Sequence, residues 1–130
     1  MAAESYAENE VGSVVFCDNR VTMSTIGNTI GKTLHVNAGQ ALSLQYHHHK
    51  DETIAVLSGE AQIDVGADEA SLRTVDLPAG SSIHVPPGLL HRVRAVSDAV
   101  LVEASTAGPG WREDVVRLSD TYGRHGTSAP

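Results

Sequence analysis

The chain has 130 residues, 41% of them hydrophobic, and its 16 Asp and Glu against nine Lys and Arg give a formal net charge of −7. These values predict one domain with one core and argue against binding to nucleic-acid phosphates or an anionic membrane surface. A single cysteine excludes an internal disulfide and any site built from several thiolates. Residues 1–10 lack the pattern of a secretory signal, and no segment approaches the ~20 apolar residues of a membrane span, so we expect a cytoplasmic protein.

Short segments rich in Val, Ile, Leu and Thr alternate with Gly, Pro, Asn and Asp along most of the chain. This rhythm is typical of antiparallel all-β sandwiches and barrels. The predicted strands, in chain order, are residues 12–16, 32–36, 41–47, 53–57, 61–65, 72–77, 82–85, 91–96 and 99–104. Helical periodicity is almost absent, and residues 111–119 fit either a short helical turn or an edge strand.

The fold class expected from this pattern is all-β, a small antiparallel β-barrel or jelly roll with little helix. One domain is expected over residues 11–124, with flexible ends at residues 1–10 and 125–130. A tight turn is predicted at Pro86-Pro87-Gly88, because proline fixes φ and glycine tolerates positive φ.

Three consecutive histidines, His47, His48 and His49, precede Glu52. Because side chains alternate along a strand, His47 and His49 are expected on one face, where two imidazoles can bind one divalent metal ion. Glu52, beyond a short turn, and His91, after the Pro-Pro-Gly turn, can supply the third and fourth ligands. Three histidines and a carboxylate suit Zn, Fe, Mn, Ni or Co and do not select among them.

Two motifs of the sequence resemble those of the cupin superfamily, the small metal-binding β-barrels. The first motif consists of Gly39, the histidine run, Glu52 and, after six further residues, Gly59. The second consists of Gly80, Pro86, Gly88 and His91. The chain departs from the usual pattern in a longer gap before His47 and a shorter gap between His49 and Glu52. The resemblance implies a cupin barrel that holds one divalent metal ion, and by analogy a homodimer that covers its edge strands.

A longer stretch resembles the C-terminal cupin domain of the bifunctional mannose-6-phosphate isomerase/mannose-1-phosphate guanylyltransferase family. It runs from Lys32 through Leu-Ser-Leu-Gln, ending at Gln45, to Glu52, and residues 114–124 resemble that domain's C-terminus. Where the family continues Glu-His-Trp, this chain has Glu52-Thr53-Ile54. The resemblance implies a metal-dependent, isomerase-like reaction on a sugar phosphate or another polar carbonyl substrate.

Several residues are candidates for roles beyond metal binding. Gln45, on the predicted face of His47, either orients substrate or simply lines the barrel. Arg124 either grips a phosphate or carboxylate with its bidentate fork or is a surface charge. For the proton transfer of an isomerase, the catalytic candidates are Glu52, if it leaves the metal, and Glu103 on a late strand. Two other functions remain open, both with a small-molecule partner: an Fe(II)-dependent dioxygenase and a non-catalytic metal- or ligand-binding cupin.

Overall fold

The fold is built from two antiparallel β-sheets. The computed structural model describes residues 12–16, 19–26 and 28–119, with side chains from residue 28 to residue 118. The first sheet contains, in spatial order, β1 (Gly12–Phe16), β2 (Asn19–Ile26), β3 (Thr29–Val36), β10 (Ala99–Thr106), β5 (Glu52–Ser58) and β8 (Ser82–Val85). The second contains β11 (Val116–Ser119), β4 (Leu44–Tyr46), β9 (Leu90–Ala95), β6 (Glu60–Gly66) and β7 (Arg73–Pro78). A single turn of 3-10 helix, η1 (Glu69–Ser71), joins β6 to β7. The predicted all-β fold is confirmed.

Two elements differ from the sequence prediction, and a third was left open by it. Strand β2 was not predicted, because Asn, Arg, Ser and Thr interrupt its apolar residues. The strand expected over residues 41–47 is confined to Leu44–Tyr46, and bends follow it. Of the two alternatives for residues 111–119, the structure forms an edge strand, since β11 lies at the end of its sheet beside β4.

The core lies between the two sheets. In β5 and β10 buried and more exposed positions alternate, so every second residue of these strands faces inward. The buried apolar cluster draws on both sheets: Leu34, Val36, Ile54, Val56, Ala61, Ile63, Val65, Leu77, Val85, Val93, Ala95, Ala99 and Leu101. These side chains fix the register of the strands, because a slip by one residue would turn each inward set to solvent.

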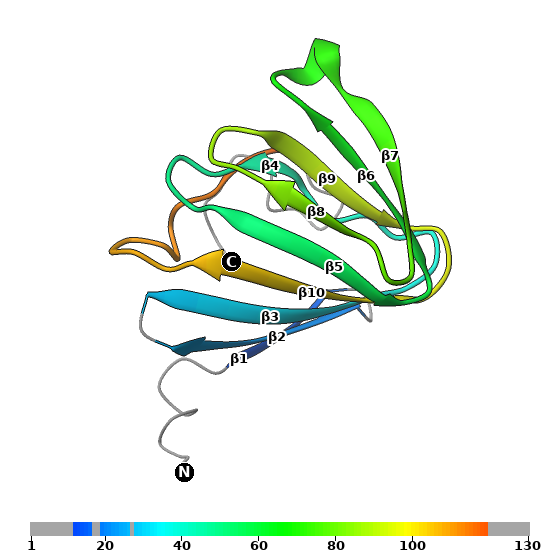
Figure 1. Ribbon diagram of the computed structural model, residues 1–130, viewed down its shortest axis with the longest axis horizontal. Helices are drawn as coiled ribbons and strands as arrows, with labels where there is room; N and C mark the ends of the chain where they lie inside the picture. The colour runs from blue at the N-terminus through cyan, green and yellow to red at the C-terminus, as the bar shows by residue number, and fades with distance from the viewer. Residues whose placement is uncertain (1–11, 17–18, 27, 120–130) are drawn as a thin grey trace.

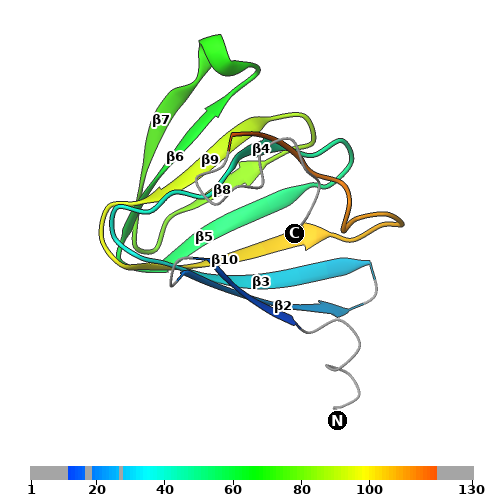
Figure 2. The same ribbon diagram turned by 180° about the vertical axis from the view of Figure 1, so that it is seen from behind.

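The strand ends gather at one end of the sandwich, where β3 and β5 begin and β10 ends (Figures 1 and 2). The orange loop between β10 and β11 crosses this end, while the β5–β6 and β7–β8 turns lie at the opposite end. Glu52, the first residue of β5, pairs with Ser105 near the end of β10, and Gln45 of β4 pairs with His91 of β9. The topology therefore brings polar residues from both sheets to the same end. In the part of the chain described here, no helix has the length and apolar character that a membrane crossing requires.

Candidate metal centre

Three of the four predicted ligands meet inside the barrel. His47 follows β4, Glu52 begins β5 and His91 lies on β9, so the group draws on both sheets. Their ligand atoms all lie within 4.8 Å of one another. The residues are 5%, 3% and 3% exposed, respectively. Two imidazoles and a carboxylate therefore converge in a site that is almost entirely shielded from water.

The hydrogen bonds of the two imidazoles leave Nε2 free to coordinate. His47 Nδ1 lies 2.5 Å from the carbonyl oxygen of Asp114, and His91 Nδ1 lies 3.0 Å from that of Leu89. Because a carbonyl oxygen can only accept, each Nδ1 carries the proton, and in the neutral ring each Nε2 has a lone pair. Such contacts to the second ring nitrogen are usual for metal-binding histidines.

The two Nε2 atoms converge on one oxygen of Glu52. Glu52 Oε2 lies 3.0 Å from His47 Nε2 and 3.5 Å from His91 Nε2. It is buried, with no hydrogen-bond partner among the described residues. Three electron-pair donors that face one another across a dry site need a cation between them. The residues therefore fit a divalent metal ion, held by His47, Glu52 and His91.

The electrostatics of these side chains favour the protonation states that bind metal. Burial lowers the pKa of His91 to about 4, so this ring is neutral at pH 7. Burial alone would raise the pKa of Glu52, but its contacts with the side chains of His47 and Glu103 outweigh burial and hold the pKa at about 2. A carboxylate and a neutral imidazole are the forms that coordinate a cation, so Glu52 and His91 need to release no proton when metal binds.

A second carboxyl group, that of Glu103 on β10, lies beside this cluster without belonging to it. Its carboxyl group interacts with that of Glu52, and its Oε2 lies 3.7 Å from Lys32 Nζ. Burial raises the pKa of Glu103 to about 7. The site thus contains an ionised carboxylate in the ligand set and a neighbouring carboxyl group that holds its proton more readily.

The structure does not bring His49 to the cluster. The alternation argument placed His49 on the face of His47, but β4 ends at Tyr46, so alternation no longer holds at residues 47–49. His48 and His49 are both exposed, and their ring centroids lie 6.3 Å apart. The ligand set in the structure is therefore two histidines and one carboxylate.

The other sequence candidates have different outcomes. Gln45 is half-buried and lines a cavity together with His47, as expected for a residue that could face a ligand. Arg124 lies outside the described residues. Glu103 lies next to the metal ligand Glu52, as described above.

Asp114 is a functional residue that sequence reasoning missed. Its carboxylate accepts hydrogen bonds from the backbone N–H groups of His48 at 2.7 Å, His49 at 2.9 Å and Lys50 at 2.9 Å. Burial opposes ionisation, but these three bonds together outweigh it and lower the pKa of Asp114. Since its carbonyl also accepts from His47, this one residue fixes both the ligand ring and the loop that carries it. The partners are 64 or more positions apart, and no local sequence pattern reports such contacts.

Replacing Asp114 by asparagine is expected to lower the free energy of unfolding at pH 7 by about 2 kcal/mol, because an amide accepts weaker hydrogen bonds than a carboxylate. The folded-state pKa of Asp114 lies below its ordinary value of 3.8, so its stabilisation is complete above that pH and is lost as the pH falls through the folded-state value. Urea titrations from pH 7 to pH 3 measure both effects. The matched control is Glu113→Gln at its exposed neighbour; equal losses in both variants would contradict the assignment.

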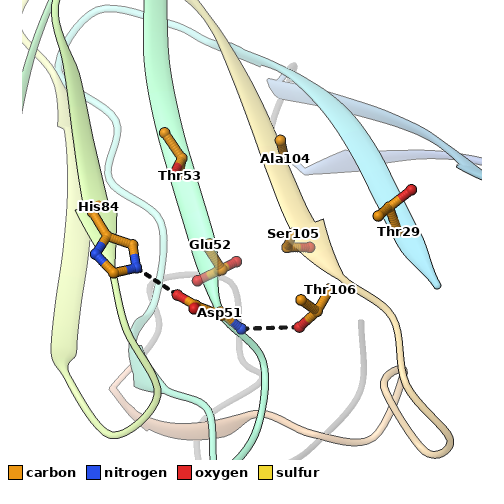
Figure 3. Close-up of a pocket in the computed structure, with 8 residues that line it drawn as sticks. All are labelled: Thr29, Asp51, Glu52, Thr53, His84, Ala104, Ser105 and Thr106. Atoms are coloured by element: carbon orange, nitrogen blue, oxygen red, sulfur yellow. Dashed lines mark hydrogen bonds and ion pairs between the residues drawn. The ribbon is translucent and has the colours of Figure 1, made fainter.

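A second hollow opens where β5 begins and β10 ends (Figure 3). On one side His84 Nε2 lies 2.6 Å from Asp51 Oδ1, and on the other the Asp51 backbone N–H donates to Thr106 Oγ1 at 3.1 Å. Buried Glu52 and Ser105 also line this hollow. It therefore reaches the ligand carboxylate from the rim of the barrel.

Residues 32–104 match the cupin domain family, which accounts for more than half of the chain. This chain belongs to the cupin family. Its relatives include the xanthan biosynthesis protein XanB of Xanthomonas campestris, 37% identical over 95 residues, and the alginate biosynthesis protein AlgA of Pseudomonas aeruginosa, 34% identical over 95 residues. A mannose-1-phosphate guanylyltransferase of Escherichia coli is 32% identical over 95 residues. Each match covers 72% of this cupin but 19% of the relative, so the chain spans about a fifth of their length.

Solved structures show the same fold. An oxalate decarboxylase of Bacillus subtilis superposes with a TM-score of 0.74 at 16% identity, covering 87% of this cupin and 32% of that chain. KdgF from Halomonas superposes with a TM-score of 0.61 at 14% identity, covering 76% of this cupin and 86% of that chain. At these identities the likeness establishes the cupin architecture and nothing about the reaction.

Proposed function

We propose that this cupin is a metal-dependent enzyme of the isomerase type that acts on a sugar phosphate. The observation that carries the proposal is the buried group of two imidazole nitrogens and one carboxylate oxygen beside a polar cavity. A structural metal site closes all four positions with protein ligands, whereas three ligands leave positions for substrate, as in catalytic sites. The relatives named for mannose-1-phosphate chemistry support a sugar phosphate as the substrate class.

Each residue around the ligand group would have a separate role in such a reaction. A divalent metal held there would supply Lewis-acid polarisation of a carbonyl group and its neighbouring hydroxyl. Glu103, beside the ligand set and outside it, would take a proton from one substrate carbon and return it to the next. Gln45, on the cavity wall, would orient the sugar by hydrogen bonding. Burial of the ligands would keep bulk water away from the reacting carbons.

The test is conversion of mannose 6-phosphate to fructose 6-phosphate by untagged, metal-loaded protein in D₂O under argon. Proton NMR would follow both the conversion and the entry of deuterium, at C1 of the fructose 6-phosphate formed and at C2 of mannose 6-phosphate re-formed by the reverse reaction. Turnover without oxygen supports the proposal. No conversion and no deuterium exchange with mannose, glucose or ribose phosphates would contradict it.

Replacing Glu103 by glutamine is expected to lower kcat at least about 100-fold while the protein still binds metal, because an amide cannot accept the proton. Elemental analysis of the purified variant checks that the metal remains. The comparison variant is Glu113→Gln, which removes an exposed carboxylate outside the barrel. If Glu103→Gln turned over at the rate of the unaltered protein, Glu103 would not be the proton carrier.

A second function is favoured by the ligand set itself. Two histidines and one carboxylate with open positions form the facial triad of Fe(II) oxygenases. Near-stoichiometric iron in protein purified without added metal, together with oxygen uptake on addition of substrate, would support this alternative. Thermal stabilisation by a sugar phosphate that stays unchanged with every metal would instead indicate a binding protein.

A further inference from the structure

A cavity next to the metal centre concentrates the positive charge of an acidic protein. Its described lining includes Lys32, Lys50, Arg112 and Arg117, four of the nine lysines and arginines in the sequence. No aspartate or glutamate is among the described residues that line it. The chain as a whole has a net charge of −7, so this grouping is not a consequence of composition.

The four cations come from separate elements and are held in place by their neighbours. Lys32 lies on β3, Lys50 follows the histidine run, Arg112 lies in the loop before β11, and Arg117 lies on β11. Two of them lie over the Trp111 ring, with Lys50 Nζ 5.7 Å and Arg112 Cζ 4.5 Å from its centroid. These cation–π contacts order the two side chains before any ligand arrives.

Two of the cations are buried, and a third, Lys32, has its Nζ 3.7 Å from Glu103 Oε2. Lys50 is 5% exposed and Arg117 is 6% exposed. Arg117 Nε donates to Ser43 Oγ at 3.2 Å, which fixes the direction of the guanidinium. The side chains of Lys50 and Arg117 both line the cavity, so an anion there would contact them directly.

We propose that this cavity is an anion subsite that binds the phosphate monoester of the substrate, while the reacting end of the same molecule lies at the metal centre. The proposal rests on the proposed function for the second half of that statement. His47 lines the cavity and also belongs to the ligand group, so a molecule bound here lies one side chain away from the metal ligands. A phosphate monoester carries nearly two negative charges and three acceptor oxygens, which suits four cations better than a carboxylate does.

The test is calorimetric titration of inorganic phosphate into the full, metal-loaded chain at low ionic strength. We expect one phosphate per chain, with an affinity that falls as NaCl is added. Lys32→Met and Arg112→Met are each expected to weaken phosphate binding about tenfold, because each removes a charge-assisted contact.

The matched control is Arg73→Met. Arg73 is exposed on β7, at the edge of the second sheet opposite β11, so this variant should bind phosphate as the unaltered chain does. Arg112 is itself exposed, so its variant is expected to fold even if Lys32→Met does not.

Two further titrations separate this site from the metal and from other anions. Glu52→Ala lacks a metal ligand, and phosphate should still bind to it if the cations form the site. If Glu52→Ala lost phosphate binding while the charge variants kept it, phosphate would be bound by the metal, and the proposal would be overturned. Acetate that bound as tightly as phosphate would overturn the assignment to a phosphate group. Phosphate binding without isomerisation would leave the subsite standing and remove the proposed function. If the charge variants isomerised the substrate as fast as the unaltered chain, the proposed function would stand and the phosphate subsite would be ruled out.

Discussion

Replacing Glu52 by alanine is expected to lower the affinity for a divalent metal at least about 100-fold, with His91→Ala close behind. Glu52 supplies the anionic ligand, and its Oε2 is the atom on which both Nε2 atoms converge. Its loss leaves two neutral imidazoles that cannot balance the charge of the ion in a buried site. The measurement is competition with a chromophoric chelator, using untagged protein and Zn, Mn, Co and Fe(II) in turn.

The matched control for Glu52→Ala is His49→Ala. The structure places His49 at the surface, so this variant should bind metal as the unaltered chain does. A loss as large as that in Glu52→Ala would mean that the metal-loaded loop turns His49 inward, as the sequence pattern predicted. A metal that binds the folded state alone also stabilises it, by about 4 kcal/mol at a thousandfold excess over Kd. Unfolding with and without EDTA should therefore show this gain in full in His49→Ala and at most about 1.4 kcal/mol of it in Glu52→Ala.

The sequence predicted the parts of the site that depend on strand ends. Glu52 and His91 lie where the predicted strands begin, and the two cupin motifs gave their spacing as well as that of His47. His49 was placed in the site by assuming that a strand continued through the histidine run. Local propensity could not show where that strand stops, because the backbone of residues 48–50 is turned toward Asp114. A contact between segments so far apart in the chain is a tertiary effect that overrides the local pattern.

The same reasoning applies to the fold and to the charged cavity. Strands with clear apolar alternation, such as β5 and β10, were predicted close to their observed limits. Strand β2 was missed because its residues are mostly polar and it is defined by its pairing with β1 and β3. The cavity cations are scattered along the sequence, and they become neighbours because β3, β11 and two loops meet at one end of the barrel. Sequence reasoning therefore recovers ligands within a motif better than a charge cluster assembled from several elements.

Replacing Gly59 by alanine is expected to lower the free energy of unfolding by at least about 3 kcal/mol. Gly59 lies in the β5–β6 turn with φ +78°, a region that costs an L-residue about 1–2 kcal/mol. A Cβ there would also lie 2.1 Å from the carbonyl oxygen of Asp98 and 2.9 Å from Cα of Ala99. Both atoms belong to the backbone, so the clash cannot be relieved by rotating a side chain, and the turn must separate from the start of β10. Urea denaturation measures the loss.

Gly80 is the control that separates the cost of the backbone conformation from the cost of the steric clash. It is also a motif glycine with a positive φ, +90°, but a Cβ built there meets no atom within 4 Å. Gly80→Ala should therefore lose only the conformational cost of about 1–2 kcal/mol. Equal losses in the two variants would contradict the steric argument and leave backbone conformation as the sole cause. Gly59 lies at the end of the sandwich opposite the metal ligands, so the folded fraction of Gly59→Ala should retain the metal affinity of the unaltered chain. Gly59 and Gly80 therefore determine the stability of the barrel, whereas the motif histidines and glutamate determine its affinity for metal. Stability and metal affinity can then be changed separately by substitution.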